Sequence, residues 1–202
     1  LIQANGNFKP SSEIKMHMRV YEKRPDVGAV VHAHPSYATS FAIAGIPLTQ
    51  PIMPEAVIAL GCVPIAKYGT PGSYEIPDAV EEYLPYFDQV LLESHGALTW
   101  GPDLLNAYYK MESLEFYAEL LYKSRQLGGP KEFSKEQVER LYEIRRQMGI
   151  PGKHPANLCP NAREGKPSCH SCGGSCTCGG TGKADAELVS TITKKVMEQL
   201  GM

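Results

Sequence analysis

The sequence predicts an α/β fold, because short apolar runs of strand character alternate along the chain with longer segments of helical periodicity. The strand-like runs are rich in β-branched residues and cover residues 27–31, 63–66 and 90–92. The clearest helical segments cover residues 13–23, 36–44 and 104–127. With 202 residues and 43% hydrophobic content, the chain can bury one sizeable core and still carry an appendage.

The first helix is expected to open at Pro10 to Glu13 and to run to about residue 23, with a serine as its N-cap. Hydroxyls and free amides at a helix start suit an anion, although Ser11 and Ser12 could equally serve as plain caps. Glu13 is a candidate metal ligand or general base, or simply a first-turn carboxylate favoured by the helix dipole. His17, one turn later, is a rival ligand that we interpret as a packing residue.

Two histidines follow the first strand-like run, at 27–31. His32 and His34 project from the same face at the period of a strand, and Pro35 ends the strand. An isolated pair of this kind is more often two satisfied core or loop histidines than a metal site. A third histidine, His95, follows the apolar run at 90–92, and three protein ligands with one open position are common at catalytic zinc. The three together predict a metal centre.

The middle of the chain alternates between helix and strand signals. The helix at 36–44 should end at Gly45, and an extended, proline-broken segment follows. The remaining expectations are one helical turn at 55–60, a strand at 63–66, a turn-rich loop at 68–72, an amphipathic helix at 78–87 and a strand at 90–92.

The longest helix is predicted at 104–127, after residues 100–103 break the preceding strand. Its stripe is mostly apolar and is interpreted as core or subunit interface: Leu105, Tyr109, Glu112, Phe116 and Leu120. Gly128, Gly129 and Pro130 should stop this helix. A further helix with a capped start at 133–137 should end near 148–151, and the first domain is expected to span 1–151.

Residues 152–183 are rich in Pro, Gly, Ser and Cys and predict a flexible linker. The linker holds five of the six cysteines, and the sequence CHSCGGSCTC at 169–178 contains four of them. These four are candidates for a second metal or redox cluster, the alternative being a disordered linker with incidental thiols: Cys169, Cys172, Cys176 and Cys178.

Residues 184–202 predict a short amphipathic helix. Its apolar stripe consists of Leu188, Val189, Ile192, Val196 and Leu200. Because so short a helix is marginal alone, it needs a partner. An enzyme followed by a flexible linker and such a helix resembles the encapsulation peptides that load enzymes into bacterial microcompartments. The alternative is a helix that docks on its own oligomer.

Charge and hydropathy exclude several classes of function. Twenty Lys and Arg residues nearly balance 22 Asp and Glu residues and are dispersed, so neither a nucleic-acid groove nor a polybasic membrane patch is expected. No apolar run approaches the roughly 20 residues of a membrane span, and no signal peptide is visible. A cytoplasmic enzyme is the default expectation.

Five motifs carry a family resemblance. KPSSE at 9–13, RPD at 24–26, VVHAHP at 30–35, YGTPG at 68–72 and SHGA at 94–97 occur in the order and spacing of the class II aldolase/adducin family. The chain resembles most the L-fuculose-phosphate aldolases of that family. The resemblance implies a three-layer α/β/α domain and a cyclic homotetramer with sites at subunit interfaces. It also implies that a helix and a glycine-rich phosphate loop precede Leu1, so the N-terminal part of the domain is expected to be missing.

The resemblance also implies a mechanism. Zinc bound by His32, His34 and His95 would polarise the ketone of L-fuculose 1-phosphate or a similar ketose 1-phosphate, while Glu13 moves the proton on the adjacent carbon. The products would be dihydroxyacetone phosphate and L-lactaldehyde, and Ser11 and Ser12 would bind the phosphate.

One position departs from the family pattern. The tyrosine that the fuculose-phosphate enzymes bring from a neighbouring subunit aligns near Pro51, which leaves Glu55 and Tyr68 as candidate acids on the aldehyde side. The alternatives are a sugar-phosphate 4-epimerase of the L-ribulose 5-phosphate type, a non-catalytic adducin-like module, or a redox or metal-binding module built on the cysteines. Confinement of a small reactive aldehyde would suit a microcompartment lumen, with a shell or cargo protein as the partner of residues 184–202.

Overall fold

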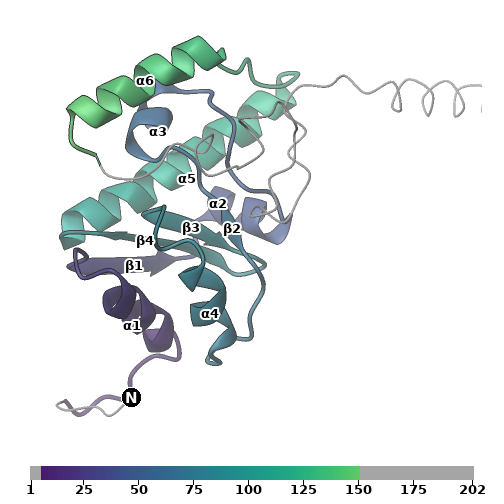
Figure 1. The fold of residues 1–202 in the computed structure, drawn as a ribbon. Coiled ribbons are helices and arrows are strands. Elements are labelled where there is room, and N and C mark those ends of the chain that lie inside the picture. The colour runs from purple at the N-terminus through teal and green to yellow at the C-terminus, as the bar shows by residue number, and fades with distance from the viewer. Residues whose placement is uncertain (1–5, 151–202) are drawn as a thin grey trace, which may run out of the picture.

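The computed structural model describes residues 6–150, which form a four-stranded sheet between two layers of helices (Figure 1). In chain order the elements are α1 (Ile14–Lys23), β1 (Ala29–Ala33), α2 (Ser36–Ile43), α3 (Pro54–Ala59), β2 (Ile65–Ala66), α4 (Glu75–Glu81), β3 (Gln89–Leu92), β4 (Gly96–Gly101), α5 (Leu104–Gln126) and α6 (Lys135–Gln147). The α/β/α expectation for the first domain is therefore confirmed.

The sheet has the order β1-β4-β3-β2. Strands β1 and β4 pair antiparallel from Ala29 opposite Gly101 to Ala33 opposite Ala97. Strands β3 and β4 form an antiparallel hairpin, and β2 pairs parallel to β3. All residues of β3 and β4 are buried, as expected for central strands covered on both faces.

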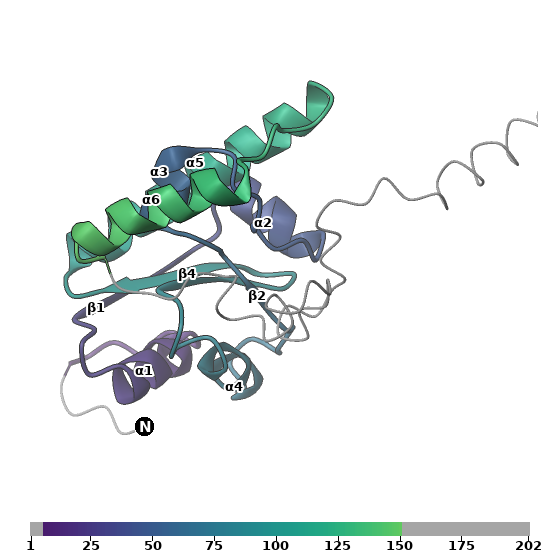
Figure 2. The same cartoon turned by 45° about the horizontal axis from the view of Figure 1, so that its top comes forward.

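The sheet separates two hydrophobic cores, one under each helical layer (Figure 2). On one face, α1 and α4 bury Met16, Val20, Ile76 and Val80 against Val90, Leu98 and Trp100. On the other face, α2, α3 and α5 bury Phe41, Ala56, Met111 and Leu114 against Leu91 and Ala97. Helix α6 packs outside α3.

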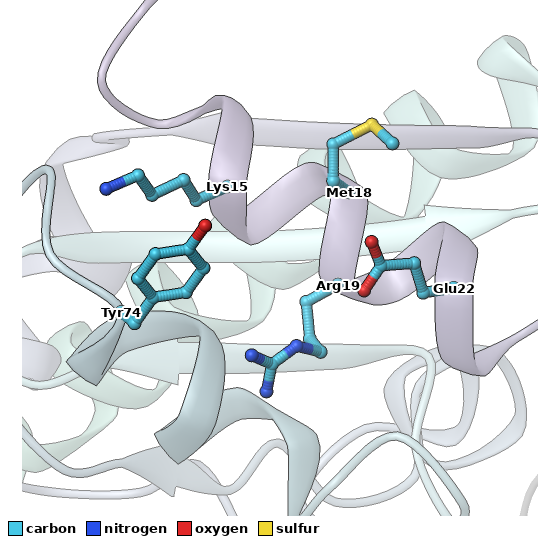
Figure 3. Close-up of a pocket in the computed structure, with 5 residues that line it drawn as sticks. All are labelled: Lys15, Met18, Arg19, Glu22 and Tyr74. Carbon is cyan, nitrogen blue, oxygen red and sulfur yellow. The ribbon is translucent and has the colours of Figure 1, made fainter. Parts of the chain in front are cut away.

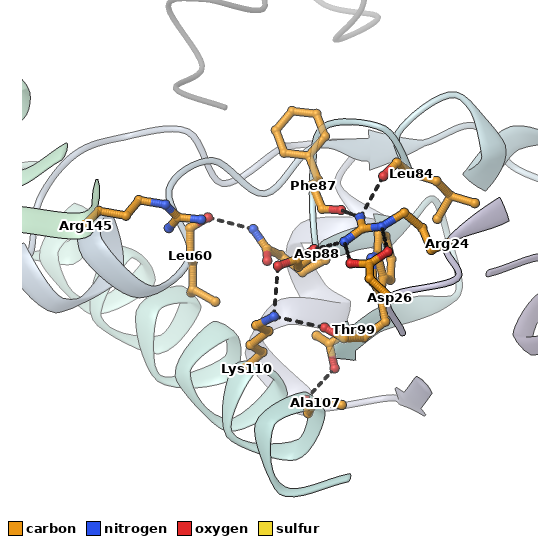
Figure 4. A network of polar contacts seen from close by, with 12 residues as sticks. Arg24, Asp26, Leu60, Leu84, Phe87, Asp88, Thr99, Ala107, Lys110 and Arg145 are labelled. Atoms are coloured by element: carbon orange, nitrogen blue, oxygen red, sulfur yellow. Dashed lines mark hydrogen bonds and ion pairs between the residues drawn. The ribbon is translucent and has the colours of Figure 1, made fainter. Parts of the chain in front are cut away.

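A polar network ties the sheet to α5 and to the end of α1 (Figure 4). The Asp88 carboxylate, only 7% exposed, accepts from the Arg24 guanidinium at 3.0 Å and from Lys110 Nζ at 2.9 Å. Lys110 Nζ also donates to the Trp100 carbonyl at 3.0 Å. Asp26 holds the same guanidinium from the solvent side at 2.7 Å. A buried carboxylate is tolerated here because two cations and their hydrogen bonds compensate it.

Several boundaries agree with the sequence. Helix α2 ends before Gly45, whose φ of +68° suits glycine, and α5 ends before Gly128 and Gly129, which also have positive φ. Helix α6 begins with a full capping box between Ser134 and Gln137.

Other expectations are corrected by the structure. Residues 96–101 form a separate strand, β4, which the sequence did not predict. The first helix has Glu13 at its N-cap in place of a serine. The helix expected at 78–87 begins at Glu75 and ends at Glu81, because Pro77 is tolerated in a first turn and the chain then continues as turns.

The stripe on α5 is also corrected. Leu105, Tyr109 and Phe116 are 62%, 56% and 49% exposed, so they are not core residues of this chain. The buried face of α5 instead consists of Ala107, Met111, Leu114, Tyr117, Ala118 and Leu121. The subunit-interface interpretation of the stripe is untouched by this correction.

Within residues 6–150, no helix combines the length and the apolar character that crossing a membrane requires.

Candidate metal centre

Three histidines meet at one edge of the sheet. His32 lies on β1, His34 follows that strand, and His95 lies in the turn between β3 and β4. The ring centroids are 4.7 Å apart for His32 and His34, 4.9 Å for His32 and His95, and 5.0 Å for His34 and His95. One ring nitrogen from each lies within 4.8 Å of the others. Among residues 6–150 this is the only group of three or more His, Cys, Asp or Glu side chains with that arrangement.

The hydrogen bonds of the cluster suit a cation. Nδ1 of His32 donates to the Ala97 carbonyl at 2.9 Å, which places the proton on Nδ1 and leaves the lone pair of Nε2 available. Nε2 of His32 and Nδ1 of His95 are buried and have no hydrogen-bond partner in the described structure. Unpartnered buried nitrogens are costly unless another group uses their lone pairs, so the three imidazoles fit a metal ion.

Burial sets the protonation of the cluster. It lowers the pKa of His32 and of His95 below the usual 6.5, while the Ala97 carbonyl at His32 and the charge of Glu13 at both oppose the effect. The neutral imidazole, which is the form that binds metal, is therefore favoured at neutral pH.

The β3–β4 turn that carries His95 is held on both sides. Ser94 adopts φ of +56° and donates its N–H to the Ala42 carbonyl at 3.1 Å. Glu93 accepts from the Tyr68 N–H at 2.8 Å and so fixes the 68–72 loop beside the turn. Gly96 must lack a side chain, because a Cβ there would lie 2.6 Å from the Ala33 carbonyl oxygen and 2.7 Å from Cδ2 of His34. The contacts of Glu93 and Gly96 could not be predicted from the sequence, since both involve segments distant in the chain; Gly96 stood there only as part of the SHGA motif.

Glu13 lies near the histidines but outside the ligand cluster. Its charge acts on His32, His95 and His17, yet its carboxylate is not among the grouped ligand atoms. Ser12 Oγ donates to Glu13 Oε1 at 3.4 Å, and Ser11 Oγ accepts from the Glu13 N–H at 3.3 Å. Both serines are exposed at the start of α1. This position suits proton transfer better than direct metal binding.

His17 lies outside the cluster of three. Burial lowers its pKa, with the charge of Glu13 acting in the opposite direction. The interpretation of His17 as a packing residue agrees with this partly buried position.

The candidate acids on the aldehyde side lie in different layers. Tyr68 is 58% exposed and belongs to the loop that Glu93 fixes beside the His95 turn. Glu55 belongs to α3 on the opposite face of the sheet, where it lines a groove of about 450 Å³ with Met53, Ala59 and Phe116. Of these two candidates, Tyr68 is the one whose loop is bonded to the turn that carries His95. The four clustered cysteines, the linker and the terminal segment lie outside the described residues.

A second, smaller pocket of about 180 Å³ lies between α1 and α4 (Figure 3). Its lining includes Lys15, Arg19 and Tyr74. Lys15 donates to the Gly72 carbonyl at 2.7 Å and lies over the Tyr74 ring, and Arg19 pairs with Asp78 at 2.8 Å. These cations join the 68–72 loop and α4 to α1 and are already engaged by the protein.

Comparison with known proteins identifies relatives that are similar in sequence over part of their length. The chain is 36% identical over 121 residues to an L-fuculose phosphate aldolase of Methanococcus maripaludis, which covers 58% of this chain and 66% of that protein. It is 33% identical over 138 residues to a 5-deoxy-D-ribulose 1-phosphate aldolase of Bacillus thuringiensis, covering 67% and 63%. A 3-oxo-tetronate 4-phosphate decarboxylase of Escherichia coli is 32% identical over 118 residues, covering 56% of each protein.

A solved structure of an L-fuculose 1-phosphate aldolase superposes with a TM-score of 0.64 at 32% identity, covering 71% of this chain and 67% of the other. The chain spans about two thirds or less of the curated relatives named above. The family profile described as Class II Aldolase and Adducin N-terminal domain matches residues 2–122. This chain therefore belongs to the class II aldolase and adducin family.

Proposed function

We propose that the protein is a zinc-dependent aldolase that cleaves L-fuculose 1-phosphate, or a similar ketose 1-phosphate, to dihydroxyacetone phosphate and L-lactaldehyde. The observation that carries the proposal is the group of three histidines whose ring nitrogens lie within 4.8 Å of one another, two of them buried without a partner. Two relatives, one named as an L-fuculose phosphate aldolase and one as a 5-deoxy-D-ribulose 1-phosphate aldolase, support the substrate class.

The roles of the residues follow from their positions. A divalent metal held by His32, His34 and His95 would supply a Lewis acid for the substrate carbonyl. Glu13, close to the histidines but outside their ligand set, returns a proton to the carbon next to the carbonyl during cleavage and removes it during condensation. Ser11 and Ser12 bind the phosphate with exposed hydroxyls at the start of α1.

Metal content and turnover of single variants test the assignment. The full chain should carry about one zinc per subunit, and His32→Ala or His95→Ala should lose both metal and aldolase activity. Glu13→Gln should keep the metal and turn over at least ~100-fold more slowly, the usual scale for a lost general base. His17→Gln is the matched control and should retain metal. Full activity of either alanine variant would exclude the site.

Decarboxylation or epimerisation of a sugar phosphate is the second candidate. A relative named as a decarboxylase and a solved structure named as a putative aldolase/epimerase/decarboxylase favour it, as does the lack of a tyrosine near Pro51. A decarboxylase releases carbon dioxide and needs no acid for an aldehyde. Incubation with L-fuculose 1-phosphate, L-ribulose 5-phosphate and 3-oxo-tetronate 4-phosphate, with product identification, separates the three reactions. A non-catalytic adducin-like module would turn over none of them and bind no metal.

The proposal includes a homotetramer. The exposed apolar side chains of α5, Leu105, Tyr109 and Phe116, offer a face that assembly would cover. Sedimentation should show an oligomer, and Phe116→Glu should dissociate it by placing a charge in that face.

On the sequence pattern alone, residues 184–202 are proposed as a targeting segment that binds a microcompartment shell or cargo protein. Fused to a fluorescent protein, the segment should give puncta in cells that make the compartment, and Ile192→Glu should disperse them. Diffuse fluorescence of the unmutated fusion would favour docking on the protein's own oligomer.

A further inference from the structure

The first turn of α2 follows the metal-site histidine His34 directly and cannot be capped by its own N-cap residue. That residue is Pro35, which has no side-chain acceptor, and no side-chain cap bond is formed there. The first backbone N–H groups of a helix need an acceptor from elsewhere. A helix start adjoining a candidate metal ligand therefore depends on a residue distant in the sequence.

Glu115 of α5 supplies both acceptors. Its Oε1 accepts from the Tyr37 N–H at 2.9 Å, and its Oε2 accepts from the Ala38 N–H at 2.8 Å. The side chain is partly buried, and it forms no salt bridge within residues 6–150. The carboxylate thus uses both oxygens on the helix start rather than on a cation.

Packing makes this contact rigid on both sides. Ala38, Phe41 and Ala42 of α2 share one core with Met111, Leu114 and Ala118 of α5. One residue, Pro35, separates His34 from α2, and its ring restricts φ, here −67°. Any shift of the α2 start therefore moves the backbone of His34. His34 is exposed, whereas His32 and His95 are half-buried, so its place depends most on its backbone.

The charge of Glu115 matters as well as its shape. A helix N-terminus carries about half a positive charge, which favours anions and disfavours a nearby cation. Because α2 starts beside His34, a divalent ion in the histidine cluster would meet this unfavourable end of the helix. A carboxylate bonded to the first-turn N–H groups cancels that partial charge.

We infer that Glu115 is a positioning residue for the metal centre: it fixes the backbone that carries His34 and neutralises the start of α2 next to the cation. This inference rests on the proposed function, since it requires a metal at the three histidines. Glu115 itself is not a ligand, because it is absent from the cluster of grouped ligand atoms.

The test compares Glu115→Gln, Glu115→Ala and the matched control Glu119→Gln in the full chain. Glu119 lies one turn further along α5, and within residues 6–150 its carboxylate pairs with Lys123. Zn²⁺ affinity is measured by chelator competition, the Co²⁺ absorption spectrum reports ligand geometry, and thermal unfolding is followed without metal. Mutation of a residue that holds a metal ligand in place typically weakens metal affinity by about 10–100-fold.

Glu115→Gln keeps an acceptor but loses the charge, and should bind Zn²⁺ about 10-fold more weakly. Glu115→Ala loses both and should bind more weakly still, with an altered Co²⁺ spectrum, while Glu119→Gln should match the unmodified protein. If Glu115→Ala does not fold, Glu115→Gln alone decides. Unchanged affinity and spectrum in Glu115→Gln, even with a lower Tm, would reduce Glu115 to a structural cap and overturn the inference. Failure of the unmodified protein to bind any divalent metal would instead overturn the proposed metal centre, and the role of Glu115 with it.

Discussion

Gly96 shows how a single missing side chain shapes the histidine cluster. Gly96→Ala would place a methyl group 2.6 Å from the Ala33 carbonyl and 2.7 Å from the His34 ring. We expect a loss of about 1–3 kcal/mol in the free energy of unfolding, as for other overpacked sites, together with weaker metal binding. Denaturant unfolding and chelator competition measure the two effects. Gly45→Ala is the control: it has positive φ but no neighbour within 4 Å, so it should lower stability and leave metal affinity unchanged.

Protons should compete with metal at the same residues. Burial lowers the pKa of His32 and His95 below 6.5, so both are mainly neutral above that pH and can bind metal. Below pH 6.5 affinity should fall as protons occupy the ring nitrogens. The metal-free protein should also lose stability as the pH falls below 6.5, because the unfolded chain then binds more protons than the folded chain. Chelator competition and urea unfolding at pH 7.5 and 5.5 check both; affinity that rises on acidification would exclude neutral histidine ligands.

At the scale of elements, Asp88 is the junction between β3, α5 and the end of α1. Asp88→Asn leaves Arg24 and Lys110 largely buried without their shared carboxylate, and should cost about 3 kcal/mol of unfolding free energy. Asp26→Asn removes a carboxylate from the same guanidinium on the exposed side and should cost less than about 1 kcal/mol. Urea unfolding of the two variants measures the contrast. Equal losses of unfolding free energy in the two variants would mean that the burial of Asp88 does not increase its contribution to stability.

Which elements the sequence could predict depended on how local their determinants are. The capping box at Ser134 and the glycines after α2 and α5 are short-range signals, and they located those boundaries. Strand β4 was missed because it is buried on both faces and so lacks alternation, while its glycines suggested a break. The stripe of α5 left core and subunit interface open, because apolar periodicity does not distinguish burial within a chain from burial between chains.

The same reasoning applies to the candidate site. The three histidines were candidates because each follows or ends an apolar run, and Glu13 was one because it is a carboxylate at a helix start within a family motif. The contact of Glu115 with the start of α2 could not be predicted, since Glu115 lies 77 residues from Ala38 along the chain. In the sequence it looks like any other charged residue of a long helix. Contacts of that range are properties of the fold.

At the scale of the whole molecule, we expect the proposed aldolase activity to depend on residues 1–151 and not on residues 152–202. Removal of residues 152–202 should leave metal content at the histidines, and turnover, within about twofold of the full chain, because every residue assigned to the chemistry lies between 11 and 95. Kinetics of the truncated protein, with metal analysis, check this. Loss of activity on truncation would favour a catalytic role for the cysteine cluster.

The sheet between the two cores has a consequence for how substitutions combine. Val80 packs in the core of α1 and α4, and Met111 in the core of α2, α3 and α5, with no buried cluster shared between them. The unfolding free energies lost in Val80→Ala and Met111→Ala should therefore add in the double variant to within about 0.5 kcal/mol. Denaturant unfolding of the four proteins measures the coupling, and a larger value would mean that the sheet transmits strain between layers. If the losses add, substitutions in one helical layer do not change the effect of substitutions in the other. The candidate site would then be sensitive to both layers, because Glu13 precedes α1, which packs in one core, and His34 precedes α2, which packs in the other.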